Sequence, residues 1–172
     1  MEDLMANATR LFAALAEEDV RTVLIGGLAA VAQGVPYMTL DIDLCYATDA
    51  ENCRHLVAAL APFNPHLRVA ALSDEEAARL GWRWDVRSLR DGPNLTLATR
   101  AGSLDLLATV PGIGAYDQVR AAAVVLPLFG QQVATLDLPA LIVSKRAAGR
   151  LKDQLALPQI EATLRMRELE RQ

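Results

Sequence analysis

Hydrophobic residues along the chain recur with either a helical or a strand period, and these periods predict the secondary structure. Apolar positions three and four apart in the first segment predict a helix that ends near Glu18. Residues 20–25 form a short run rich in β-branched side chains that stops at Gly26 and Gly27, which predicts a buried strand and a sharp turn. Residues 39–47 alternate between two kinds of side chain, and this predicts a strand with two different faces.

Turn and capping residues mark the elements that follow. Residues 28–33 are expected to form a short helix closed by Gly34. The spacing of a capping box predicts a helix over residues 48–60, and the same spacing predicts a short helix over residues 73–80. Residues 82–90 fit either a strand or a loop, and we leave both interpretations open.

The second half of the chain is expected to contain strand pairs and then helices. Two hairpins are predicted, one from residues 95–99 and 103–110, the other from residues 124–129 and 132–136. Pro139 suits the first turn of a helix whose apolar positions run from Leu141 to Leu155. Pro158 is then expected to open a C-terminal helix over residues 158–171.

The chain is expected to form one domain over residues 1–172, with a core at about 20–153. It has no internal repeat, no low-complexity tract and no linker rich in Ser or Gly. An early alternation of strand and helix followed by hairpins indicates the α+β class.

Composition and charge exclude several kinds of protein. The 172 residues are 52% hydrophobic and 22% charged, which excludes an intrinsically disordered chain. A net charge of −4 argues against a broad basic surface for nucleic acid, although a local basic patch stays open. Cys45 and Cys53 are too few for a disulfide framework and lack zinc-ligand spacing. Because no apolar run reaches the length of a membrane span and the first residues lack signal-peptide features, we expect a cytoplasmic protein without a membrane partner.

Three aspartates are the main candidates for chemistry. Asp41 and Asp43 are two residues apart in a predicted strand, so their side chains share a face about 7 Å apart. Asp105 interrupts an apolar strand, where an unpaired acid would be costly to bury. If the two strands are neighbours, the three carboxylates converge and could hold Mg²⁺, which prefers oxygen ligands. The alternatives are a solvated strand face for the pair and an edge-strand acid for Asp105.

Several segments resemble the polymerase-β-type nucleotidyltransferase superfamily, and most closely its small bacterial branch of AbiEii-like toxins and minimal nucleotidyltransferases. Its first motif is similar to residues 23–29 (VLIGGLA), 34–36 (GVP) and 39–44 (TLDIDL). Its third-carboxylate strand is similar to residues 102–107 (GSLDLL). Its later lysine helix is similar to residues 138–145 (LPALIVSK) and 150–153 (RLKD). The resemblance implies a mixed β-sheet flanked by helices, with helices at the C-terminal end.

The resemblance also implies roles for the glycines and the acids. Gly26 and Gly27 would let the backbone approach a nucleoside triphosphate. Asp41 and Asp43 would ligate Mg²⁺, or Mn²⁺ in its place. Asp105 would complete the metal site and act as the general base. An acceptor hydroxyl would then attack the α-phosphate and expel pyrophosphate.

Two lysines are the candidate phosphate ligands. Lys145, Gly149 and Lys152 follow a helical spacing, which would place both ammonium groups along one stripe of one helix. The resemblance implies that Lys145 and Lys152 bind the nucleotide, with Lys145 acting as a point charge on a phosphate. Loss of Lys145 is then expected to weaken nucleotide binding about tenfold while stability stays nearly unchanged. The alternative for an amphipathic helix is a solvated basic face, in which case nucleotide affinity would not change.

The function implied is transfer of a nucleoside monophosphate to a hydroxyl of RNA, protein or a small molecule. The resemblance extends to toxin–antitoxin systems, so an antitoxin or toxin protein is a candidate partner. Tyr37 stands where relatives commonly carry arginine, and this favours an alternative: a catalytically silent protein that binds a nucleotide or a partner. Trp82 and Trp84 could stack on a base or pack in the core.

Overall fold

A computed structural model describes residues 2–69, 73, 76, 79, 81–91 and 94–170 of the chain. Its centre is a seven-stranded mixed sheet in the order β3-β4-β5-β2-β1-β9-β8. The strands of this sheet are β1 (Thr22–Ile25), β2 (Asp41–Tyr46), β3 (His66–Leu67), β4 (Asn94–Thr99), β5 (Gly102–Leu107), β8 (Ala123–Leu128) and β9 (Gln131–Leu136). A second, two-stranded sheet pairs β6 (Thr109–Val110) with β7 (Gly114–Ala115). The α+β class and the mixed sheet flanked by helices are therefore confirmed.

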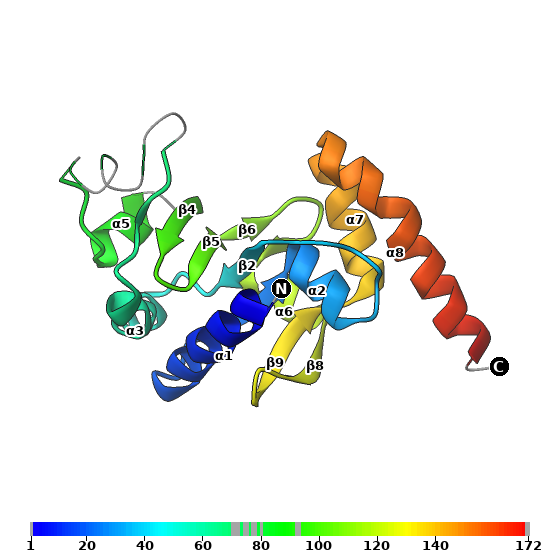
Figure 1. Ribbon diagram of the computed structural model, residues 1–172, viewed down its shortest axis with the longest axis horizontal. Coiled ribbons are helices and arrows are strands. Elements are labelled where there is room, and N and C mark those ends of the chain that lie inside the picture. The colour runs from blue at the N-terminus through cyan, green and yellow to red at the C-terminus, as the bar shows by residue number, and fades with distance from the viewer. Residues whose placement is uncertain are drawn as a thin grey trace.

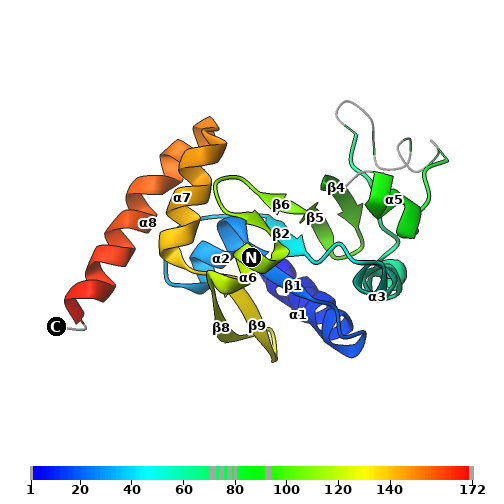
Figure 2. The same ribbon diagram turned by 180° about the vertical axis from the view of Figure 1, so that it is seen from behind.

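Helices flank this sheet at both ends and over its middle strands (Figures 1 and 2). They are α1 (Glu2–Glu17), α2 (Gly26–Ala32), α3 (Ala50–Leu60), the 3₁₀ turn η1 (Ala61–Phe63), α5 (Val86–Asp91), α6 (Tyr116–Ala121), α7 (Leu138–Ala148) and α8 (Leu151–Glu170). Figure 1 shows α3 and α5 beside β4 at one end, and the packed pair α7 and α8 at the other. The far tip of α8, at Glu170, points away from the sheet.

The alternation predicted for β2 divides this strand between a core face and a cavity face. Ile42, Leu44 and Tyr46 are at most 1% exposed and pack in the core, where the Tyr46 hydroxyl donates to the carbonyl of Leu89 on α5. The odd-numbered side chains of the strand therefore point to the opposite face of the sheet.

Three predicted elements differ from the structure at their boundaries. The Gly26–Gly27 pair does not form a separate turn, because both glycines belong to the first turn of α2. Asp49, rather than the residue before it, caps α3 by accepting a hydrogen bond from the Asn52 backbone N–H at 3.1 Å. Residues 86–91 form α5, where we predicted a strand or loop; Asp85 and Ser88 cap it reciprocally.

The two C-terminal helices also divide differently from the prediction. The first ends at Ala148, because Gly149 adopts a left-handed conformation (φ 64°) that closes the helix. The last helix starts at Leu151, so Pro158 lies inside it rather than opening it. Leu155 consequently belongs to α8 and is 69% exposed, not part of the buried face of the preceding helix.

Two further predictions concern the segment around residue 80. Ser73 and Glu76 make the reciprocal hydrogen bonds of a capping box, but the remainder of the short helix predicted over residues 73–80 lies largely outside the described residues. Trp82 and Trp84 are half-buried against the core, and Trp84 Nε1 donates to the carbonyl of Val57 at 3.0 Å. These contacts support the packing interpretation of the two tryptophans.

The far end of α8 is tied to the core. Arg167 Nη2 donates to the backbone carbonyl of Gln33 at 2.6 Å. Gln33 is itself buried, and its side-chain amide donates to the carbonyls of Ala29 and Leu136. The helix is thus fixed to α2 and to the end of β9 over a large distance in sequence.

Buried Asn52 holds the start of β1 and the end of β2 together. Its side chain accepts from the Arg21 N–H at 2.7 Å and donates to the carbonyls of Arg21 and Ala47. We predict that Asn52→Ala lowers the free energy of unfolding by about 1–3 kcal/mol, because buried backbone groups lose their partners. Urea unfolding should show this loss, whereas Arg54→Ala, an exposed change two residues along α3, should leave stability within about 0.5 kcal/mol.

Candidate active site

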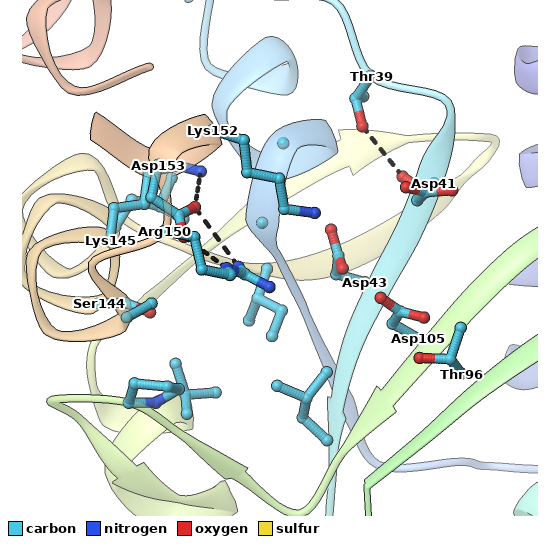
Figure 3. A pocket seen from close by; sticks show the side chains of 18 of the residues that line it. Thr39, Asp41, Asp43, Thr96, Asp105, Ser144, Lys145, Arg150, Lys152 and Asp153 are labelled. Atoms are coloured by element: carbon cyan, nitrogen blue, oxygen red, sulfur yellow. Dashed lines mark hydrogen bonds and ion pairs between the residues drawn. The ribbon is translucent and has the colours of Figure 1, made fainter. Parts of the chain in front are cut away.

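The pairing of β2 with β5 brings the predicted acids together. The strands are parallel, and their register sets Asp43 opposite Asp105 and Asp41 opposite Ser103. All three carboxylates lie on one face of the sheet and line a cavity of about 700 Å³ (Figure 3). Asp43 and Asp105 are direct neighbours on adjacent strands, and Asp41 is one pair of residues further along.

Asp43 is the most strongly perturbed of these acids. Burial, the negative charge of Asp105 and that of Asp41 raise its pKa from 3.8 to about 6. The positive charge of Lys152 and a hydrogen bond from the Gly27 N–H act in the opposite direction but do not cancel the rise. Burial is the largest cause of the rise, so ionised Asp43 would be stabilised by a cation that binds beside it.

Asp41 is held differently from the other two acids. Its Oδ1 lies 3.7 Å from Nη1 of Arg68, in an ion pair whose side chains are 38% and 53% exposed respectively. Within the described residues, no three His, Cys, Asp or Glu side chains are grouped closely enough to hold a metal ion. The structure thus brings Asp43 and Asp105 face to face and leaves Asp41 beside them, paired with Arg68.

Because Gly26 and Gly27 have no side chain, the side chains of neighbouring residues lie close to their backbone. Gly26 has φ +67°, and a Cβ at this position would lie 2.0 Å from Asp43 Oδ2. A Cβ on Gly27 would lie 2.8 Å from Thr39 Oγ1 and 3.1 Å from Tyr37 Cε1. Both residues line the cavity, so they stay candidates for contact with a nucleotide, but the close approach visible here is to side chains of the protein.

Lys145 is an internal ion-pair partner rather than a residue of a solvated stripe. It is 8% exposed, and its Nζ donates to Oδ1 of Asp153 at 3.1 Å. Asp153, 1% exposed, also accepts from Arg150 Nε at 2.6 Å. Burial alone would raise the pKa of Asp153, but the hydrogen bonds and charges of Arg150 and Lys145 outweigh burial and lower it.

The single lysine stripe predicted from the spacing is wrong. Lys145 lies on α7 and Lys152 on α8, because the chain turns at Gly149 between them. Lys152 is exposed, and Figure 3 shows its amino group directed toward Asp43. Lys152 is therefore the lysine that faces the acids, whereas Lys145 is occupied by Asp153.

Sequence reasoning assigned no role to Arg150, Asp153 or Arg68, and it treated Tyr37 only as a departure from the family's motif. Tyr37 lies under Lys145, whose Nζ is 5.7 Å from the ring centroid, a cation–π distance. Arg150 and Asp153 stand in the quoted RLKD segment, and their charges offered a signal that the spacing argument did not use. Arg68 lies between the recognised motifs, where nothing in the sequence marks it.

Comparison with known proteins supports the fold alone. No protein-family model matches the chain, and no curated protein matches it significantly. The chain is similar to the crystal structure of a Thermotoga maritima protein described as a "putative nucleotidyltransferase", with a TM-score of 0.50 and 16% identity. The similarity covers 94% of this chain and 88% of that one. The nucleotidyltransferase-like architecture expected from the sequence is thereby confirmed, whereas the AbiEii-like branch is not addressed.

Among the described helices, none combines the length and the apolar character that crossing a bilayer requires.

The buried ion pair generates a prediction that replaces the earlier expectation for Lys145. Lys145→Ala should lower the free energy of unfolding by about 1.5–3 kcal/mol, because Asp153 keeps Arg150 but loses a charged hydrogen-bond partner. Lys152→Ala removes an equal charge from an exposed position of the same cavity and should change stability by less than about 0.5 kcal/mol. Equal melting temperatures for the two variants would contradict the structural role of Lys145.

The raised pKa of Asp43 generates a second prediction. A folded-state pKa above the unfolded value means that ionised Asp43 destabilises the fold, and this cost appears as the pH rises from about 4 through about 6. Asp43→Asn should therefore stabilise the metal-free protein at pH 7.5, by at most about 3 kcal/mol for two pKa units. Thermal unfolding at pH 7.5 and pH 4 should show that the gain disappears in acid; a gain of equal size at both values would disprove the electrostatic cause.

Proposed function

We propose that this protein is a Mg²⁺-dependent nucleotidyltransferase that moves a nucleoside monophosphate from a nucleoside triphosphate to a hydroxyl group. One observation carries the proposal. Asp43 and Asp105 oppose each other on neighbouring parallel strands, and Lys152 faces them within the same cavity. Acids beside cations in an open cavity suit a substrate that combines phosphates with a divalent ion.

The donor atoms of the acids fit magnesium. Asp41, Asp43 and Asp105 offer only carboxylate oxygens, which Mg²⁺ and Mn²⁺ both accept, and Mg²⁺ completes its shell with substrate phosphates and water. Asp43 and Asp105 already adjoin, and Asp41 would join them by leaving Arg68. When bound, the ion would neutralise charge that develops on the phosphates during transfer.

The chemical step follows from the positions of the acids. Asp105 lies between Asp43 and Thr96 in the register, on the side of the pair away from Lys152. In the proposed step Asp105 takes the proton of the acceptor hydroxyl, and the oxygen forms a bond to the α-phosphorus. The bond from that phosphorus to the bridging oxygen breaks, and pyrophosphate leaves.

The cations at the α7–α8 turn would bind the leaving group. Lys152 would contact the phosphates as a point charge. Arg150, whose guanidinium interacts electrostatically with Asp43 and Asp105, would add a second positive charge near the phosphates. Lys145 also lines the cavity, and its contribution to nucleotide binding would be mainly indirect, through Asp153 and Arg150. Gly26 and Gly27 would lie beneath the triphosphate.

A second candidate function is binding of a nucleotide or a partner without transfer. The ion pair between Asp41 and Arg68 favours it, because a carboxylate held by arginine is less available to a metal ion. A toxin–antitoxin setting with a protein partner rests on the resemblance of the sequence to AbiEii-like toxins, and it belongs to the proposal on that ground.

Calorimetric titration with each nucleoside triphosphate tests the proposal. We expect binding that weakens at least tenfold when Mg²⁺ is removed, and Asp43→Asn and Lys152→Ala should each weaken it by a similar factor. Asp117→Asn, an exposed change on α6, is the matched control and should bind like the wild type. Binding that is independent of Mg²⁺ would reject the metal site, and mass spectrometry of acceptors after incubation would separate transfer from silent binding.

A further inference from the structure

Side chains on the cavity face of the sheet form one row that continues past the acids. Strand register aligns Asp43 on β2 with Asp105 on β5, and Asp105 with Thr96 on β4. The backbone N–H of Arg68 then donates to the Thr96 carbonyl at 2.9 Å, which extends the row past β4. Because neighbouring strands are about 4.8 Å apart, the backbone of Arg68 lies about 10 Å from that of Asp105. The guanidinium of Arg68 reaches back from there to Ser103 and Asp41.

Lys152 distinguishes one end of this row from the other. Lys152 faces Asp43, at the end of the row that adjoins Gly26 and β1. In phosphoryl transfer the attacking and leaving oxygens stand roughly in line at the phosphorus. If pyrophosphate leaves toward Lys152, the attacking hydroxyl must arrive from the opposite side, over Thr96 and Arg68.

Arg68 is suited to bind an anion at that place. Its side chain is 53% exposed, and its Nη1 donates to Ser103 Oγ at 3.2 Å, which occupies one of its five N–H donors. Its distance of 3.7 Å from Asp41 is beyond that of a good hydrogen bond, so the pair is loosely held. Guanidinium groups bind phosphates through two parallel hydrogen bonds.

The charges around Arg68 indicate which class of acceptor it would bind. An acceptor that approaches Asp41 and Asp105 with a phosphate of its own would be repelled by these carboxylates and by the net charge of −4. A neutral acceptor would need no cation on this side, and a cationic acceptor would be repelled by Arg68.

We propose that Arg68 is an acceptor-binding residue and that the acceptor carries a phosphate close to the hydroxyl that attacks. This inference rests on the proposed nucleotidyl transfer and names the acceptor class for the same site. Two sources supply such a phosphate: the end of an oligonucleotide strand, or a small phosphorylated metabolite such as a nucleoside monophosphate.

Binding of paired probes tests the inference. One pair is a fluorescent oligoribonucleotide with a free 3′ end and the same strand with a neutral methylphosphonate in its last linkage. The other pair is a nucleoside 5′-monophosphate and its parent nucleoside, measured by calorimetry. All four are titrated into the full chain with Mg²⁺ and a non-hydrolysable triphosphate present.

We expect the phosphate-bearing member of at least one pair to bind at least tenfold more tightly than its neutral partner, and the pair that responds identifies the source. Arg68→Gln should abolish this difference, Arg68→Lys should retain part of it, and Arg54→Gln, an equal change of charge on α3, should retain all of it. Triphosphate affinity should not fall in Arg68→Gln, because the substitution removes a competitor for Asp41.

Two outcomes overturn the inference while the proposed function stands. One is equal binding of phosphate-bearing and neutral probes by the wild type, and the other is an unchanged preference in Arg68→Gln, in each case with Mg²⁺-dependent triphosphate binding intact. Loss of triphosphate binding in the wild type itself would instead reject the proposed function, and the inference with it.

Discussion

The parallel pairing of β2 with β5 is the constraint on which the rest of the site depends. A register shift of one residue would turn the acids of one strand to the core face, where Ile42 and Leu44 are packed. The hydrophobic side chains on the core face therefore fix the position of the carboxylates on the other face. The electrostatic repulsion between Asp43 and Asp105 is tolerated because core packing, not the acids themselves, determines the register.

A second interaction holds the cations opposite these acids. Asp153 is almost fully buried and receives hydrogen bonds from Lys145 and Arg150, which joins the end of α7 to the first turn of α8. Breaking such a pair on one side is costly, because it leaves an uncompensated charge in the interior. The exposed Lys152 lies in the same turn. The buried residue Asp153 therefore stabilises the fold, whereas its neighbour Lys152 is a candidate for binding the ligand.

Sequence reasoning found what depends on local pattern. Alternation in β2 gave the shared face of Asp41 and Asp43, and the apolar flanks of Asp105 placed it in a strand. That this strand pairs with β2 became visible only in the sheet order. It failed where a single residue redirects the chain, as at Gly149, whose left-handed conformation separates two lysines that periodicity had put on one helix. It also could not find Arg68, because the contact of this residue with Asp41 is created by sheet order, which no local pattern encodes.

The bond from Arg167 to Gln33 has a consequence for the thermodynamics of any ligand. Because α8 is anchored near one end through Asp153 and near the other through Arg167, the helix acts as a brace between the sheet and the cavity rim. The backbone of the helix that carries Lys152 is ordered when the chain folds, and a ligand that binds there need not supply that part of the entropy. Affinity gained in this way comes from preorganisation rather than from additional contacts, and its source lies at the opposite end of a twenty-residue helix from the bound molecule.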